Sequence, residues 1–270
     1  MISIIVSTYR KSYFDALLQS IRKTIGEIAF EVIPIENHGQ YSISQAYNLG
    51  AEQAQYNLLC FVHEDVIFES SDWGKVLLRA FQTDADLGAL GVAGGRKTQL
   101  PTGWGSGVRD WDSMYIHHGV DHLIHLKGDT TKINVLDGVL IVTPKTVWQE
   151  FRFDETVGGF HFYDIDYSLR VAQKYHLKLT EQLLICHFSQ GNFGSQWIKS
   201  CLNYHRTHRA LLTDLLVGRK ETSQIRKFYY GGGQPGIRQA SWWRKLQYVC
   251  ALGIDFQTIK TAIRFLLKHG

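Results

Sequence analysis

The sequence predicts an α/β fold in which helices flank a mostly parallel sheet, followed by a basic helical tail. The first observation is that short apolar, strand-like segments alternate with helix-like segments in the first half of the chain. The second is that polar residues directly follow three of these strands, where open sheets of this kind bind ligands. The third is the charge of residues 219–270. They hold ten Lys or Arg and two Asp or Glu, a net of +8, although the whole chain carries only +4.

The first half of the chain supplies the elements of the sheet in order. Ile2–Ser7 is a continuous apolar, β-branched run, which is typical of a strand buried on both faces. Tyr13–Lys23 has helical spacing of its apolar residues, and Glu31–Ile35 is a second strand. Ser44–Ala54 follows as a helix for which Ser44 is a plausible N-cap. The next elements are a third strand over Asn57–Val62, a helix over Trp73–Phe81 and a strand over Gly88–Ala93.

The periodic pattern stops between Gly94 and Lys132, where glycine, tryptophan and histidine cluster. A long stretch without periodicity inside a domain is typical of a lid or a binding loop, which we expect here. Val135–Val142 is apolar again, an amphipathic helix follows Phe160–Phe162, and Leu183–Cys186 is a short strand.

The composition shifts after Gly218, so we expect one domain over residues 1–218 and a basic, aromatic helical tail over residues 219–270. Trp242–Gly270 offers one or two helices. One helical face of this tail could lie on an anionic bilayer and meet a lipid-linked acceptor, or it could pack on the domain or on a second subunit of a homodimer. The apolar residues on that face are Ile259, Ile263, Leu266 and Leu267.

The N-terminus opens directly as a strand, without the charged and apolar regions of a secretory signal. No apolar run reaches the ~18–20 residues that span a bilayer. The scattered cysteines are typical of free thiols in a reducing compartment. We therefore expect a cytoplasmic protein, peripheral at the inner face of the cell membrane if the tail binds lipid.

Three strand ends carry the candidate binding residues, and parallel strands would bring them to one edge of the sheet. The triplet His63-Glu64-Asp65 directly follows a buried strand, where an unpaired carboxylate would be costly. Carboxylate and diphosphate oxygens suit Mg²⁺ or Mn²⁺, although a solvated turn is the alternative. Glu36 could accept from the N–H groups of uracil or guanine, and Tyr9 could pack on the base. Alternatively, Glu36 is a surface residue beside a turn.

Six segments in this order resemble the GT-A fold glycosyltransferases of family 2, in particular the bacterial glycosyltransferase-like branch linked to capsule and surface polysaccharide synthesis. The resemblance covers about residues 1–200, and the segments are SIIVSTYR, VIPIENHG, ISQAYNLGAEQA, LLCFVHEDV, DGVLIVTPK and FHFYDIDYSLRV. It implies metal-dependent transfer of one sugar, with inversion, from a nucleotide-diphosphate sugar to a hydroxyl acceptor, either a glycan or lipid-linked. A UDP-sugar is the preferred donor, a GDP-sugar is the alternative, and the cation is Mn²⁺ or Mg²⁺.

The resemblance also implies roles for the donor site. Tyr9 and Glu36 match positions that hold the base, with Thr8 and Arg10 beside Tyr9, and Asn48 matches an asparagine near the donor. The His63-Glu64-Asp65 triplet matches the family's D-x-D motif, which makes Asp65 the metal-binding carboxylate. His63 replaces the first aspartate, so the metal has one carboxylate fewer, but an imidazole can still contact ribose or a metal-bound water.

On the acceptor side, Asp164 matches the family's catalytic base, with Asp166 as second choice. His187 matches a residue that completes the metal site or contacts the diphosphate. Asp137-Gly138 resembles the acceptor-side loop, where glycine would admit a sugar. The alternatives are that Asp164 merely caps a helix and that His187 is structural.

Two other functions compete with sugar transfer. A sugar-phosphate nucleotidyltransferase needs a Gly-rich basic loop after its first strand, but Tyr9–Ser12 holds no glycine. A non-catalytic nucleotide-sugar or carbohydrate-binding module is the other, because His63 departs from the D-x-D pattern. Nucleic-acid binding is disfavoured because the body of the chain is net acidic.

Overall fold

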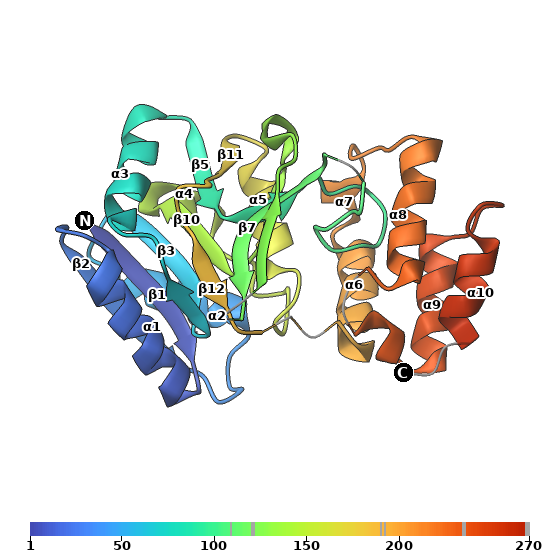
Figure 1. Ribbon diagram of the computed structural model, residues 1–270, viewed down its shortest axis with the longest axis horizontal. Coiled ribbons are helices and arrows are strands. Elements are labelled where there is room, and N and C mark those ends of the chain that lie inside the picture. Colours follow the sequence, from blue (N-terminus) through green and yellow to red (C-terminus); the bar gives the residue numbers. More distant parts are fainter. Residues whose placement is uncertain (109, 120–121, 190, 192, 234–235, 268–270) are drawn as a thin grey trace.

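A six-stranded, mostly parallel sheet forms the centre of the protein, with strand order β11-β5-β10-β3-β1-β2 (Figure 1). The computed structural model describes residues 1–108, 110–119, 122–189, 191, 193–233 and 236–267. Only β10 runs against its neighbours β3 and β5. The strands are β1 (Ile2–Thr8), β2 (Phe30–Glu36), β3 (Leu58–His63), β5 (Leu87–Gly91), β10 (Leu140–Pro144) and β11 (His176–Leu179).

The register of the three N-terminal strands brings their polar ends together. β1 lies between β2 and β3 and runs parallel to both. Thr8 pairs with Glu36 on one side, and Ser7 pairs with His63 on the other. The strand ends therefore meet at one edge of the sheet, as the sequence predicts.

Helices cover both faces of this sheet. Alternate residues of β1 belong to opposite cores, because Ile4 and Val6 pack with α1 and α3 whereas Ile5 packs with α2, α4 and α5. Helix α2 begins one residue earlier than expected, and its N-cap is Ser42 rather than Ser44. Ser42 and Gln45 form a capping box, and Ser44 is buried inside the helix. These helices are α1 (Lys11–Thr24), α2 (Ile43–Gln53), α3 (Trp73–Thr83), α4 (Lys145–Phe151) and α5 (Tyr163–Val171).

A second sheet, in the order β4-β12-β7-β6-β9 with β8 paired to β7, takes β7 and β8 from the region expected to be a loop. The expectation of a loop over residues 94–132 was therefore wrong for β7 and β8, which form a hairpin, whereas the described residues between β6 and β7 form no helix or strand. The hairpin strands mix apolar residues with partly exposed polar ones, and this hides the strand period. The strands are β4 (Val66–Phe68), β6 (Ala93–Gly95), β7 (Asp112–His118), β8 (His122–Leu126), β9 (Val135–Leu136) and β12 (Ile185–His187).

Helices α6 to α10 form the other end of the molecule, away from the first sheet (Figure 1). They share one apolar core, in which the Trp197 ring of α6 stacks on Tyr229 of α8 with 6.1 Å between centroids. The division into domains at residue 218 stays a prediction, and residues 268–270 of the expected tail lie outside the described residues. These helices are α6 (Ser195–Thr207), α7 (Arg209–Leu212), α8 (Arg219–Gly231), α9 (Trp242–Leu252) and α10 (Ile259–Leu267).

In the part of the chain that the structure describes, no helix combines the length and apolar character needed to cross a membrane. Short 3₁₀ helices complete the fold at Thr130–Lys132 and Ile237–Gln239.

Gly50 sets how closely α2 approaches β1, which gives a test of the packing. A Cβ atom on Gly50 would lie 2.3 Å from Cγ2 of Ile5, a stiff buried side chain. We expect Gly50→Ala to lower the free energy of unfolding by about 1–3 kcal/mol in chemical denaturation. The matched control is Gly231→Ala, at a helical glycine with open space around it, which should stabilise the protein by less than about 1 kcal/mol. Equal effects of the two substitutions would contradict the close approach.

Candidate active site

The buried carboxylate of Glu64 holds the loop that follows β1. Its Oε2 atom accepts hydrogen bonds from the Thr8 hydroxyl at 2.6 Å and from the backbone N–H groups of Tyr9 and Arg10 at 2.9 and 3.0 Å. Three donors on one oxygen satisfy the charge of a carboxylate that is withdrawn from water. Glu64 and Thr8, both predicted to bind the donor, are therefore bonded to each other and position the loop.

The side chains of Tyr9, Arg10 and Glu36 remain open to solvent at the same edge. Tyr9 is 54% exposed, and the Arg10 guanidinium lies 5.1 Å from its ring centroid. Glu36 is exposed at the end of β2, opposite Thr8. An aromatic face, a cation and a carboxylate at one edge provide groups that can contact a base and its phosphates.

His63, Asp65 and His187 form a cluster whose ligand atoms all lie within 4.8 Å of one another. Nε2 of His187 is 3.3 Å from Oδ1 of Asp65, and both side chains are largely buried. Burial alone would raise the pKa of the Asp65 carboxyl, but the hydrogen bond and charge of His187 bring it well below its usual value. Burial, followed by the charge of His187, lowers the pKa of His63, so its imidazole is neutral at pH 7.

This cluster fits a divalent cation, and its donors favour one of the two predicted ions. One carboxylate and two imidazoles supply oxygen and nitrogen ligands. Mg²⁺ prefers oxygen alone, whereas nitrogen ligands suit transition metals, so the donor set favours Mn²⁺. His63 was expected to contact ribose or a metal-bound water, but it lies beside Asp65 and His187, the two predicted metal ligands. His118, which the sequence shows only as part of a histidine pair, also places its ring 5.7 Å from that of His187.

A hydrogen-bonded chain joins this cluster to the acceptor-side loop. The Tyr163 hydroxyl contacts Nε2 of His63 at 2.8 Å and the Gly138 carbonyl at 3.1 Å. Since the hydroxyl must donate to the carbonyl, Nε2 of His63 donates to the hydroxyl and Nδ1 keeps its lone pair. A Cβ on Gly138 would lie 2.0 Å from the Tyr163 hydroxyl. The space that we expected to admit a sugar is thus filled by Tyr163, a residue that sequence reasoning missed.

Asp164 stands at the start of α5, beside the same loop. Its two carboxylate oxygens accept from the backbone N–H groups of Gly138 at 3.0 Å and Ile165 at 2.9 Å. Burial and the charge of Asp137 nevertheless raise the pKa of Asp164 to about 7. Asp137 is itself held by the Trp104 indole N–H at 2.6 Å. A carboxylate with a near-neutral pKa suits general-base catalysis.

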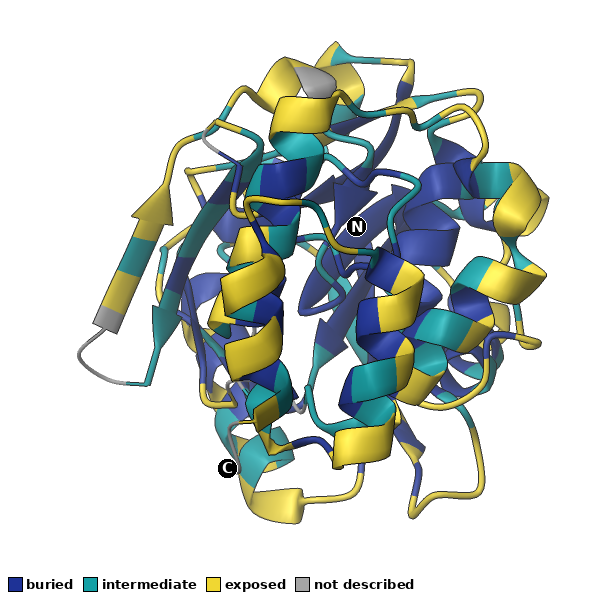
Figure 2. Ribbon diagram, turned by 90° about the vertical axis from the view of Figure 1, so that its right-hand side faces the viewer, coloured by how far each residue is buried: buried dark blue, intermediate teal, exposed yellow. Residues whose placement is uncertain are grey.

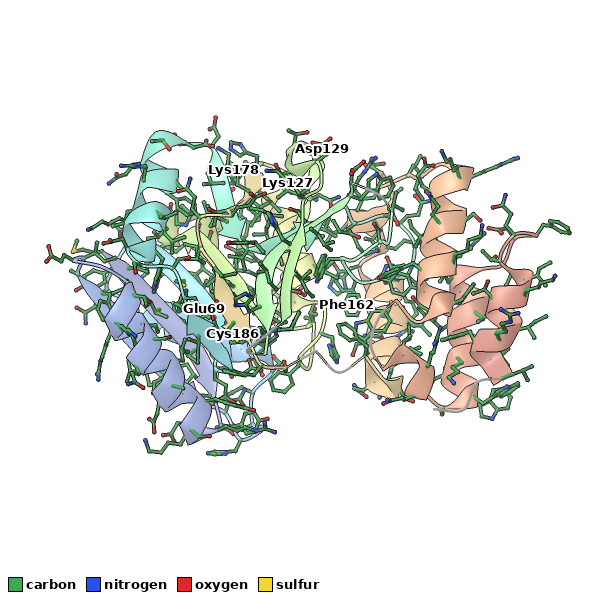
Figure 3. The ribbon with its side chains drawn as sticks, viewed as in Figure 1. Glu69, Lys127, Asp129, Phe162, Lys178 and Cys186 are labelled. Atoms are coloured by element: carbon green, nitrogen blue, oxygen red, sulfur yellow. The ribbon has the colours of Figure 1, made fainter. Side chains whose placement is uncertain are left out.

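The backbone just before Asp164 is constrained by the helical end of the molecule. Phe162 has a left-handed conformation (φ 71°), which is uncommon for a non-glycine residue. Its ring stacks on Tyr204 of α6 with 5.3 Å between centroids, at the boundary between the sheets and the helical end (Figure 3). Packing on α6 therefore fixes the turn that presents Asp164.

Two of the predicted site residues, Asn48 and Asp166, bond to other groups inside the protein. The side-chain amide of Asn48 bonds inside the protein to the Phe153 backbone, to Glu155 and to the Trp148 indole, which takes up both of its donors and its oxygen. Asp166 is fully buried and forms an ion pair with Arg170 at 2.7 Å. It also belongs to a second cluster with Asp154 and His208, but there Arg170 already supplies the positive charge.

Comparisons with known proteins agree with this fold. The model of a family described as "Glycosyltransferase like family" matches residues 3–204. No curated protein sequence that was compared with the chain matches it.

Three solved structures are similar in fold. The mannosyltransferase PcManGT from Pyrobaculum calidifontis, in complex with GDP-Man and Mn²⁺, has a TM-score of 0.50 and 12% identity, over 98% of this chain and 73% of that one. TarS 1-349 from S. aureus, in complex with UDP-GlcNAc, has a TM-score of 0.52 and 11% identity, over 98% and 79%. GalNAc-T7 with UDP, GalNAc and Mn²⁺ has a TM-score of 0.53 and 9% identity, over 100% and 55%. At these identities the likeness shows the fold alone, and it confirms the predicted GT-A class.

The cluster of His63, Asp65 and His187 gives a test of metal binding. We expect Asp65→Asn to weaken Mn²⁺ binding at least about tenfold in calorimetry, because a neutral amide replaces the only carboxylate ligand. Asp154→Asn, in the second cluster, is the matched control and should bind Mn²⁺ as the unmodified chain does. If Asp154→Asn is the variant that loses binding, the ion occupies the second cluster instead.

Proposed function

Since the chain belongs to this glycosyltransferase-like family, we propose that it transfers one sugar from a nucleotide-diphosphate sugar to a hydroxyl acceptor, with inversion. The observation that carries the proposal is the connection between two sites. The candidate cation ligand His63 is joined through Tyr163 to Gly138, whose N–H holds the carboxylate of Asp164. A place for the leaving diphosphate and a base for the acceptor are thus linked by hydrogen bonds.

For the donor, we propose a UDP-sugar, with a GDP-sugar as the alternative. The exposed carboxylate of Glu36 can accept from N–H groups that both uracil and guanine present, and Tyr9 offers a face for either base. The nucleotides named with the similar structures are of both kinds. Glu64 would act on this site indirectly, because its three hydrogen bonds hold the loop that carries Tyr9 and Arg10.

Asp65, His187 and His63 would hold the cation, preferably Mn²⁺. When bound, such an ion neutralises the charge that develops on the departing diphosphate. The low pKa of Asp65 keeps this ligand ionised throughout the neutral range. We propose that Asn48 contributes to the donor site by holding the Phe153–Glu155 segment rather than by direct contact.

Asp164 would be the general base. It takes the proton of the acceptor hydroxyl as that oxygen bonds to the anomeric carbon, and the bond from this carbon to the diphosphate breaks with its electron pair leaving on the diphosphate. One displacement at one carbon inverts its configuration. Asp137 raises the proton affinity of Asp164 through its charge.

The acceptor would be a glycan or a lipid-linked molecule in surface polysaccharide or glycolipid synthesis in the cytoplasm. A nucleotidyltransferase fits less well, because α1 begins at Lys11 and leaves only a short loop without glycine after β1. A non-catalytic binding module remains an outcome of the first test below.

Replacing the base separates catalysis from binding. We expect Asp164→Asn to reduce transfer about 10²–10⁴-fold, because the amide cannot accept the proton, while donor binding in calorimetry is unchanged. Asp154→Asn should retain turnover. Unchanged turnover in Asp164→Asn would remove this residue from the mechanism, and donor binding without transfer or donor hydrolysis by the unmodified chain would indicate a binding module.

The pH profile tests the same residue independently. The active form of a base is deprotonated, so kcat/KM should rise about tenfold per pH unit below pH 7 and level off above it. Asp137→Asn removes a negative neighbour, which lowers the pKa of Asp164 and should move the midpoint to lower pH. A kcat/KM that stays constant between pH 5 and 8 would contradict Asp164 as the base, because this range brackets its pKa of about 7.

A further inference from the structure

Helix α10 carries apolar residues both on its buried side and on its exposed side. Its inner side packs Ala262 and Phe265 into the core formed with α8 and α9. The helices at this end of the molecule have exposed outer sides (Figure 2). On α10, apolar residues at a spacing of four share this exposed side. They are Ile259, Ile263 and Leu267, with Phe256 one turn earlier. The inner side suffices for folding, so the outer side needs another explanation.

The apolar side chains on this outer side are highly exposed to solvent. Phe256 is 92% exposed, Leu267 is 68% exposed and Ile263 is 50% exposed. Single exposed apolar residues are ordinary on a protein surface, but a contiguous row of them indicates an interaction site.

Helix α9 carries two exposed tryptophans at the same end of the molecule. α9 and α10 are consecutive, packed helices joined by a short turn, so the start of α9 lies toward the end of α10. Trp243 at that start is 70% exposed, and its neighbour Trp242 is exposed as well. Tryptophan side chains are enriched where an apolar phase meets water, because the ring is apolar and the indole N–H is polar.

The charged residues of α10 itself are both positive. Lys260 and Arg264 are exposed on α10 and border the apolar row along one side. Asp255 is the only acidic residue within 242–267, and it forms an ion pair with Arg226 at 3.1 Å. We define the outer face as Trp242, Trp243, Phe256, Ile259, Ile263 and Leu267 with these two cations.

We propose that the outer face docks on the surface of a lipid bilayer that contains anionic headgroups. Its apolar side chains would enter the interface while Lys260 and Arg264 meet the headgroups, as in helices that lie in the membrane plane. Two copies of this chain fit less well, because a two-fold contact would bring the cations of the two faces together without any carboxylate of the face to pair with them.

The test is flotation of the full chain with vesicles, which requires no enzymatic activity, so its outcome is separate from that of the proposed function. We expect the chain to float with equimolar phosphatidylcholine and phosphatidylglycerol, and only weakly with phosphatidylcholine alone. Phe256→Ser with Ile263→Ser should lower partitioning at least about tenfold, since two apolar side chains no longer enter the interface. Lys260→Gln and Arg264→Gln should each lower partitioning about fivefold, and added salt should act in the same direction.

Leu216→Ser is the matched control, because Leu216 is 70% exposed but lies before α8, outside the outer face. It should float as the unmodified chain does. Quenching of tryptophan fluorescence by lipids brominated on their acyl chains should decrease in Trp242→Phe with Trp243→Phe. The proposal is overturned if the unmodified chain does not float, if the outer-face variants float equally well, or if light scattering shows a dimer that these variants dissociate.

Discussion

The carboxylate of Glu64 is the contact on which the candidate site depends. One oxygen accepts three hydrogen bonds from the turn after β1, and this ties that turn to the turn after β3. Without it, the buried Thr8 hydroxyl and two partly buried backbone N–H groups would lose their partner. Because His63 and Asp65 flank Glu64 in sequence, the same anchor fixes the backbone that carries two of the candidate cation ligands.

The carboxyl groups of Asp65 and Asp164 differ in their proton affinity. Histidine neighbours keep Asp65 ionised, whereas burial and Asp137 raise the pKa of Asp164 to about 7. Groups of the same chemical type thereby become suited to two different tasks, holding a cation and accepting a proton. The link through Tyr163 and Gly138 places the two groups on one hydrogen-bonded framework.

The sequence predicted the frame of this site better than its internal contacts. Apolar runs identified β1 and β3, the sequence also predicted β2, and parallel pairing then put the polar ends of all three strands at one edge. The β7–β8 hairpin was missed because partly exposed polar residues conceal its period. The bonding of Asn48 could not be predicted, since its partners lie about a hundred residues away. Tyr163 was missed for the same reason, because its two partners come from other elements.

The left-handed turn at Phe162 has a consequence for how such chains can be recombined. The Phe162 ring packs against Tyr204 and Trp197 of α6. The match to the family model also ends within this helix. A chimera joined upstream of α6 would keep every candidate ligand and the base, yet lose the surface against which the base-bearing turn is shaped. An exchangeable module must therefore include at least the sheet region together with α6.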